Sequence, residues 1–395
     1  MLLEPVDPNE RFRARRRQAR RRRAARRIAA LSVVALAAAG LTLGARFLNE
    51  RDTKTSATPT TTDADQTPAA PKPQPRPYPS EMRGVHITMA LASLEGKVDQ
   101  YLELTRHGLN TLELDIKDEN GEVAFRRPVV ALAHKAGAAR GYYNPYEVAE
   151  KVHAQGVYLV GRIVVFEDPV LSESLPRYAI RRSDGGVWHT VAGLGWVNPY
   201  NKGVWKYVTD LGEAAAKAGF DEIQFDYVRF PTDGDLSSAV FPGETKQSKA
   251  RVITSFLEYA SKRLKPLAVR VSADVFGLSA SRNMGIGQRP NRIAPHLDAI
   301  YPMVYPSHFG AGEYNLPDPN AQPGRTVALA LRDFDSALTG QKTRLVPWLQ
   351  DFSLGRTYSL EDVQDQIQAA RDAGAEGFML WNGDGVYTRA ALAGR

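Results

Sequence analysis

The 395-residue sequence contains no cysteine, so disulfide bonds, thiolate nucleophiles, zinc ribbons and iron–sulfur clusters are all excluded. Its seven histidines are scattered and lack the H-x-H or H-E-x-x-H spacing of a metal site. Glycine-rich phosphate-binding loops and the G-x-S-x-G nucleophile motif are also missing. The sequence therefore predicts no metal and no cofactor, and it argues against a nucleotide-binding or serine-hydrolase site.

The net charge is +7, but most of the chain carries no excess of positive charge. Residues 1–50 contain twelve arginines and four acidic residues, so they contribute +8 by themselves. The remaining residues are close to neutral. Because a nucleic-acid-binding domain carries positive charge on its folded surface, the sequence predicts no nucleic-acid partner.

The N-terminal region has the pattern of a membrane anchor. Eleven arginines lie between Arg11 and Arg27, and the 18 residues that follow, 28–45, carry no charge. Eighteen helical residues approach the thickness of a bilayer's hydrocarbon core, about 30 Å, and a positive cluster before a span stays in the cytoplasm. We therefore expect a cytoplasmic segment 1–27, a single-pass transmembrane helix or signal anchor 28–45, and an extracytoplasmic remainder in the cell membrane. Secretion after signal-peptide cleavage is the alternative.

Residues 46–80 are rich in threonine and proline and poor in large apolar side chains. Such a composition cannot build a core, so it predicts an extended or disordered linker. The linker would hold a folded domain, residues 81–395, away from the membrane.

Within residues 81–395, short apolar segments alternate with helical patterns, which is typical of βα units around a parallel sheet. Eight strands are expected, at 83–88, 110–117, 157–166, 221–229, 268–276, 298–305, 344–350 and 376–381. Helices are expected between them, including 145–155, 201–218, 245–264 and 360–373. The pattern predicts an α/β fold, a (β/α)8 TIM barrel with loop insertions. An open doubly wound sheet is the alternative, but its glycine-rich turn is missing.

Acidic side chains alternate with apolar ones along three of these strands. Because side chains alternate between the two faces of a strand, the apolar residues would face the helices and the acidic residues the barrel lumen. This places Asp115, Asp226 and Asp274 on the inner side, in the second, fourth and fifth strands. Active sites of such barrels lie at the C-terminal ends of the strands, so three strands direct an aspartate to that end.

Asp226 and Asp274 stand at the ends of adjacent strands. Glycoside cleavage needs two carboxyls about 5–9 Å apart, one to protonate the leaving oxygen and one to attack the anomeric carbon or activate water. A carboxyl beside a like charge also has the raised pKa that an acid needs. Glu113, Lys117 and Arg270 face the lumen in the same alternation; for them a structural ion network in the lower barrel and a functional role are both open.

Aromatic side chains gather near the same strand ends, and an aromatic-rich barrel mouth suits a carbohydrate. The set consists of Trp188, Trp196, Tyr200, Tyr227, Phe276, Tyr301, Tyr305, Trp348 and Trp381.

Five motifs resemble those of a known family. They are Arg83-Gly84-Val85-His86, Leu114-Asp115-Ile116-Lys117-Asp118, Trp196-Val197-Asn198-Pro199-Tyr200, the stretch from Gly219 to Pro231, and Tyr301-Pro302-Met303-Val304-Tyr305-Pro306. They are similar to the bacterial TIM-barrel family called "putative glycoside hydrolase", a distant relative of the α-amylase-like glycosidases. The resemblance covers roughly residues 80–390 and implies a glycosidase barrel that acts on a polysaccharide or oligosaccharide.

In the α-amylase-like relatives the nucleophile is an aspartate at the end of strand four, and the acid/base is a glutamate at the end of strand five. Asp226 matches the first position, whereas Asp274 stands where the glutamate would be. Glu167, just past the third strand, is a further candidate for the acid. The candidate substrate-binding residues are His86, Asp115, Lys117, Arg162, Tyr227, Arg229, Tyr305, Trp348 and Trp381.

The sequence thus predicts an extracytoplasmic glycoside hydrolase that is attached to the membrane through its N-terminal helix. A non-catalytic carbohydrate-binding barrel on the cell surface is the alternative. Schiff-base chemistry at Lys117 is a weaker hypothesis, because Asp115 and Asp118 would keep the amine protonated.

Overall fold

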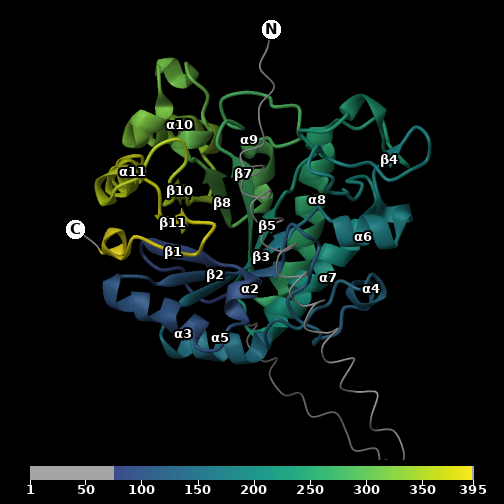
Figure 1. Cartoon of the computed structure of the whole chain (residues 1–395), viewed down its shortest axis with the longest axis horizontal. Coiled ribbons are helices and arrows are strands. Elements are labelled where there is room, and N and C mark those ends of the chain that lie inside the picture. Colours follow the sequence, from purple (N-terminus) through teal and green to yellow (C-terminus); the bar gives the residue numbers. More distant parts are fainter. Residues whose placement is uncertain (1–74, 394–395) are drawn as a thin grey trace, which may run out of the picture. The chain divides into compact units, whose positions relative to one another are not determined.

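The computed structural model describes residues 75–393 (Figure 1). The predicted segments 1–27 and 28–45, and the linker up to residue 74, lie outside this range. Residues 75–79, the end of the predicted linker, have no regular secondary structure. Within the described range, no helix is both long enough and apolar enough to span a bilayer.

The described residues form a closed parallel barrel of eight strand positions, as the sequence predicts. The sheet order is β10-β11-β1-β2-β3-β5-β7-β8-β9, and β10 also pairs with β8, which closes the ring. The strands are β1 (Met82–Ile87), β2 (Thr111–Lys117), β3 (Tyr158–Val164), β5 (Glu222–Asp226), β7 (Arg270–Phe276), β8 (Ala299–Met303), β9 (Arg344–Leu345), β10 (Trp348–Gln350) and β11 (Gly377–Trp381). The predicted strand 344–350 is thus broken into β9 and β10, and the other seven are each found as one strand.

Helices cover the outside of this barrel (Figure 1). The longer ones are α5 (Pro145–Ala154), α7 (Lys202–Ala218), α8 (Lys249–Leu264), α10 (Pro323–Leu338) and α11 (Leu360–Asp372). Shorter ones are α2 (Met89–Ala92), α3 (Lys97–Leu102), α4 (Ala131–Lys135), α6 (Pro169–Ser174) and α9 (Pro290–Ile293). Two loop strands, β4 (Arg181–Arg182) and β6 (Ala239–Val240), pair antiparallel outside the barrel.

Helix α7 illustrates how the local sequence sets these elements. The side chain of Asn201 accepts a hydrogen bond from the backbone N–H of Gly203 and so caps the first turn. Val204, Val208, Leu211 and Ala215 form the buried face at helical spacing. Gly219 ends the helix at φ 110°, a left-handed conformation that glycine adopts without strain.

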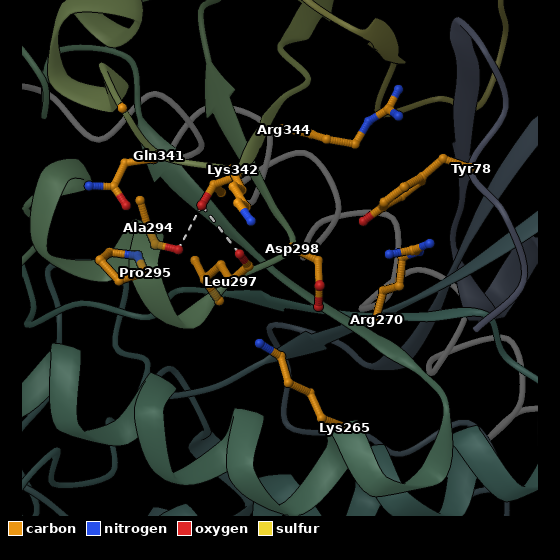
Figure 2. Close-up of a pocket in the computed structure, with 12 residues that line it drawn as sticks. Tyr78, Lys265, Arg270, Ala294, Pro295, Leu297, Asp298, Gln341, Lys342 and Arg344 are labelled. Atoms are coloured by element: carbon orange, nitrogen blue, oxygen red, sulfur yellow. Dashed lines mark hydrogen bonds between the residues drawn. The ribbon is translucent and has the colours of Figure 1, made fainter. Parts of the chain in front are cut away.

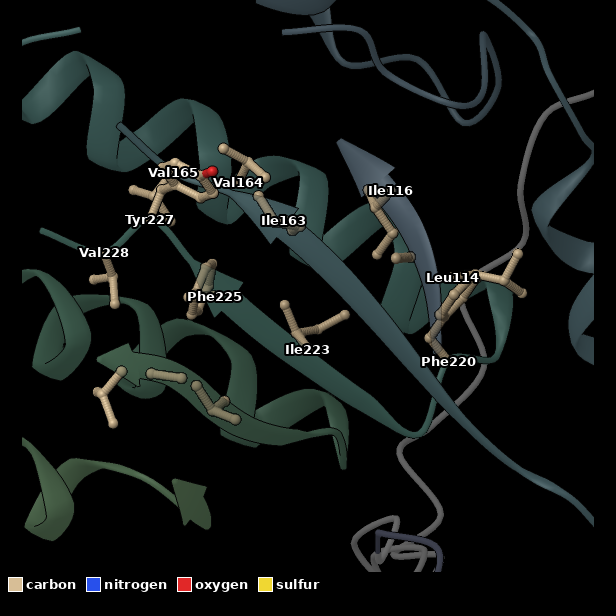
Figure 3. Packing of buried hydrophobic residues seen from close by; sticks show 14 of the residues in the cluster. Leu114, Ile116, Ile163, Val164, Val165, Phe220, Ile223, Phe225, Tyr227 and Val228 are labelled. Carbon is tan, nitrogen blue, oxygen red and sulfur yellow. The ribbon is translucent and has the colours of Figure 1, made fainter. Parts of the chain in front are cut away.

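The main core lies between the barrel and its helices (Figure 3). Leu114, Ile223 and Phe225 point outward from their strands and are fully buried there, as the predicted alternation requires. A second cluster lies inside the barrel and extends from Met82, Tyr158 and Tyr301 to Tyr305 and Trp348. The barrel interior is therefore closed by packed side chains below, and the polar strand ends lie above.

Candidate active site

Asp226 and Asp274 come from neighbouring strands at the same level of the barrel. Phe225 of β5 pairs with Ala273 of β7, so the next residue of each strand is an aspartate in the same row. Adjacent strands are about 4.8 Å apart, which keeps the two side chains close. Both are almost completely buried, with exposed fractions of 6% and 2%. The predicted convergence of these two carboxyls is found.

Arg162 of β3 joins Asp226 to Asp115. Its Nη2 and Nε donate hydrogen bonds to Oδ2 of Asp226, at 2.6 and 3.0 Å, and its Nη1 donates to Oδ1 of Asp115 at 2.7 Å. The carboxylate of Glu119, on the loop after β2, lies 3.6 Å from the same Nη1. All three predicted residues of this group, Asp115, Arg162 and Asp226, thus form one buried ion cluster.

His86, at the end of β1, extends the cluster. Its Nδ1 lies 2.5 Å from Oε2 of Glu113, and its Nε2 lies 3.6 Å from Oδ2 of Asp115. Burial would lower the pKa of His86, but the charges of Asp115 and Glu113 outweigh burial and raise this pKa to about 9. For the acidic Asp115, burial alone would raise the pKa. The positive charges of His86 and Arg162 outweigh burial and hold this pKa well below its ordinary range. His86 therefore carries a positive charge at neutral pH, and Asp115 a negative one.

Asp274 lies in different surroundings from Asp226. Its Oδ1 accepts hydrogen bonds from Nε1 of Trp348, at 2.7 Å, and from the side-chain amide of Gln224. Burial, and then the charge of Asp226, raise the pKa of Asp274 well above its ordinary value. No hydrogen bond from the described residues reaches its Oδ2. Asp274 is therefore a carboxyl that can be protonated at neutral pH, with Oδ2 available to hold the proton.

Three predicted aromatic residues line this group. The ring centroids of Trp381 and His86 are 4.7 Å apart. The guanidinium carbon of Arg162 lies 5.7 Å from the ring centroid of Trp381. Trp348 stands perpendicular to Trp381 at 5.6 Å. Burial and the charges of Asp274 and Asp226 raise the pKa of Tyr305, so its hydroxyl stays protonated. Trp348, Trp381 and Tyr305 therefore form an apolar wall beside the two carboxyls.

Tyr301 does not belong to this wall. Tyr301 pairs with Asp274 in the same row of the sheet. Its hydroxyl, however, donates to the sulfur of Met82, at the start of β1, at 3.3 Å. The prediction that Tyr301 lies at the catalytic face is wrong because its side chain extends toward the N-terminal end of the barrel.

Lys117 is also outside the cluster. The pairing of β2 with β3 shifts register between Asp115 and Lys117, and this irregularity turns the lysine toward the loop after β3. There its Nζ donates to the carbonyl of Val164 at 2.7 Å and lies 3.1 Å from Oδ2 of Asp168. A shared network with Glu113 and Arg270 is contradicted, whereas a substrate contact of Lys117 stays a prediction. The contacts of Lys117 with Val164 and Asp168 stabilise the loop after β3.

Arg229, a predicted substrate-binding residue, packs among aromatic rings. Its guanidinium lies 4.8 to 5.0 Å from the ring centroids of Phe276, Trp196 and Tyr227. Its Nη1 donates to the carbonyl of Phe230 at 3.1 Å. Tyr227 itself has a left-handed backbone at φ 50°, which turns the chain sharply just after Asp226. Tyr227 and Arg229 are both buried, and they lie directly after the end of β5.

Glu167 lies on the loop between β3 and α6. It is 1% exposed, its carbonyl accepts a hydrogen bond from Lys117 at 3.3 Å, and its backbone pairs with that of Trp196. No described contact joins its carboxyl to Asp226 or Asp274, so its role as an acid stays a prediction.

Several site residues carried no signal in the sequence. The side-chain amide of Gln224, on β5, donates to Asp274. Glu119 lies on the loop after β2. Tyr143 donates to the carbonyl of Asp115 at 2.8 Å from a loop 28 residues away. Only the folding of these loops over the barrel end brings them to the cluster. Among residues 75–393, no group of three or more His, Cys, Asp or Glu side chains is arranged to hold a metal ion.

A closed parallel barrel with a carboxyl pair at its strand ends belongs to the TIM-barrel class of hydrolase-like proteins. The chain is a member of the family described as "Putative glycosyl hydrolase domain", whose model matches residues 84–387. The family resemblance found in the sequence is thereby confirmed, and a glycoside hydrolase-like function follows at this coarse level.

The first two of the following solved structures share the fold, and the third is similar in sequence. The PgaB (BpsB) glycoside hydrolase domain of Bordetella bronchiseptica is 14% identical, over 77% of this chain and 95% of that one, with a TM-score of 0.57. An exo-β-N-acetylglucosaminidase of Vibrio harveyi is 12% identical, over 81% of this chain and 54% of that one, with a TM-score of 0.51. A hypothetical protein from Ruminiclostridium thermocellum is 34% identical, over 48% of this chain and 97% of that one, with a TM-score of 0.44. No curated protein sequence matches the chain.

The position of Lys117 predicts a structural role. Lys117→Met would leave the buried carboxylate of Asp168 without its cation, so we expect the free energy of unfolding to fall by about 3 kcal/mol. Lys151→Met breaks an exposed pair with Asp99 and should change it by no more than about 0.5 kcal/mol. Urea unfolding measures both. A Lys117→Met protein of unchanged stability that has lost its activity would restore a chemical role for this lysine.

The raised pKa of His86 predicts a pH dependence of stability. The folded pKa of about 9 lies above the unfolded value of 6.5, so this contribution is complete below pH 6.5 and is lost as pH rises through 9. We expect the free energy of unfolding to fall over this interval, and to fall less in His86→Gln. The exposed His107→Gln is the matched control and should keep the wild-type slope. Equal slopes in all three proteins would contradict the assignment.

Proposed function

We propose that the barrel hydrolyses glycosidic bonds of a polysaccharide or oligosaccharide, with Asp274 as general acid and Asp226 as nucleophile or general base. The observation that carries this proposal is the contrast between two neighbouring carboxyls. Asp226 accepts two hydrogen bonds from a guanidinium, whereas Asp274 is buried, has a raised pKa and accepts only neutral donors. When the surroundings of two carboxyls shift their pKa values apart, the carboxyl with the higher pKa acts as the acid and the other acts as the base.

The chemistry follows from these environments. Asp274 gives its proton to the glycosidic oxygen as the bond between that oxygen and the anomeric carbon breaks. Asp226 then either forms a bond to the anomeric carbon, later hydrolysed by water, or removes a proton from the attacking water. Its Oδ1 already accepts the backbone N–H of Tyr227 at 2.6 Å, which fixes the carboxylate plane. Asp115 and Arg162 orient it from the other side.

Trp381 and Trp348 would receive a sugar ring beside the carboxyls. Perpendicular rings at 5.6 Å offer one face and one edge to a ligand, and aromatic walls with few polar groups are usual in ligand pockets. The family membership supports a carbohydrate as the ligand. His86, charged and adjacent to Trp381, would donate a hydrogen bond to a sugar hydroxyl.

Location is a second part of the proposal. The arginine cluster 11–27 and the uncharged run 28–45 support a single-pass anchor with the barrel outside the cytoplasm. Barrel and anchor would be joined by the Thr/Pro-rich linker. A polysaccharide of the cell envelope or the environment would then be within reach of the site.

Substitution of the two aspartates tests the catalytic part. On a substrate found by screening envelope and environmental glycans, Asp226→Asn and Asp274→Asn should each lower kcat at least 10³-fold, roughly the contribution of positioned acids and nucleophiles, while the fold is kept. Asp351→Asn is the matched control. Asp351 follows β10, is 6% exposed and bonds Thr388 rather than the pair, so its variant should keep activity.

Two results would overturn this assignment. Full activity in both variants would remove the carboxyl pair from the mechanism. A wild-type protein that binds glycans but releases no product would favour the non-catalytic carbohydrate-binding barrel.

Extraction of membranes at alkaline pH tests the location. With residues 28–45 acting as an anchor, the full chain remains in the membrane pellet, and exchange of Leu31, Val34 and Leu41 for Asp releases it, since a charge in the hydrocarbon core is costly. The chain would appear in the supernatant from the start if the segment were cleaved or did not span.

A further inference from the structure

A polar cavity lies at the opposite end of the barrel from Asp226 and Asp274 (Figure 2). Arg270 and Arg344, which line it, are the first residues of β7 and β9, so the cavity opens at the N-terminal ends of the strands. Its volume is about 480 Å³, which is within the range of small-molecule sites, about 300–1,000 Å³. None of the catalytic candidates contributes to its lining.

The lining is strongly basic. Lys265, Arg270, Lys342 and Arg344 contribute four cations, and Asp298 contributes the only carboxylate among the lining residues. None of the four cations has an ion-pair partner within 4.0 Å among residues 75–393, and Asp298 is occupied by the backbone N–H of Val271 at 3.0 Å. Figure 2 shows the guanidinium of Arg270 turned toward Tyr78, and Lys265 and Lys342 on the other side of Asp298. The cavity therefore has a local excess of positive charge.

The two arginines retain unused donors. Nε of Arg270 and Nε of Arg344 are buried and find no hydrogen-bond acceptor among the described residues. Buried donors without an acceptor are costly, so a bound acceptor would stabilise them. Glu222, on the strand beside Arg270, makes no ion pair with it: burial raises the pKa of Glu222, and its carboxyl accepts a hydrogen bond from Tyr158 at 3.1 Å.

Tyr78, from the end of the predicted linker, holds the two arginines together. Arg270 and Arg344 stack on its ring, with 4.2 and 4.5 Å from each guanidinium carbon to the ring centroid. Two like charges on one ring repel each other, and a multivalent anion beside them would offset that repulsion.

We propose that this cavity binds the phosphate group of a phosphorylated ligand. Guanidinium and ammonium groups together are the usual partners of phosphate, and a doubly charged group balances an excess of three positive charges better than a carboxylate does. The phosphate can belong to a soluble phosphorylated molecule or to an anionic lipid headgroup. The site lies beside the residues that join the barrel to the linker, so either source can reach it.

Thermal unfolding of the full chain tests the site, since a ligand that binds only the arginine-rich N-terminal segment does not stabilise the barrel. At constant ionic strength, pyrophosphate should raise the Tm of the wild-type barrel by about 3 °C or more, and chloride or acetate by less than about 1 °C. Lys265→Gln/Lys342→Gln and the single Lys342→Glu should lose the shift. Lys135→Gln/Lys246→Gln removes the same charge at exposed positions outside the cavity and should keep it.

The proposal is wrong if pyrophosphate stabilises the wild-type barrel no more than acetate does, or if the control pair loses the shift as fully as the cavity pair. Sedimentation with phosphatidylglycerol vesicles, compared with phosphatidylcholine, then identifies the source. Weaker sedimentation of the cavity pair than of the control pair indicates a lipid headgroup. Equal sedimentation, with the pyrophosphate shift present, indicates a soluble ligand.

Discussion

The buried guanidinium of Arg162 is the interaction on which the strand ends depend. Four acidic side chains contact either Arg162 or His86 in this largely buried region. They are Glu113, Asp115, Glu119 and Asp226. Burying such charges costs several kcal/mol each unless opposite charges and hydrogen bonds compensate. Arg162 compensates two of them directly and a third at 3.6 Å, and His86 compensates the rest by holding its proton.

The same arrangement explains why the two aspartates differ. Asp226 lies within the reach of Arg162, whereas Asp274, one strand further round the barrel, receives an indole and an amide instead. The negative charge of Asp226 then acts on Asp274 without a nearby cation to offset it fully. A short step around a closed sheet thus separates a carboxylate paired with a guanidinium from a carboxyl whose pKa is raised.

The two ends of the barrel have distinct chemistry because the lumen between them is filled. Met82, Tyr158 and Tyr301 pack across the N-terminal half, and the hydroxyl of Tyr158 donates to the buried Glu222 at 3.1 Å.

The sequence by itself determined the strand order along the chain, the barrel and the inward aspartates, because alternation along a strand and helix-ending glycines are local properties. It also identified Arg162 and Trp348 as candidates without assigning their contacts. Only the tertiary structure decided that Lys117 turns away at an irregular pairing, that Tyr301 lies below the site and that Arg229 stacks among aromatic rings. These outcomes depend on the register between strands and on loops from distant parts of the chain. Neither is encoded in the spacing of residues along a single strand, so the members of the site were predictable and their partners were not.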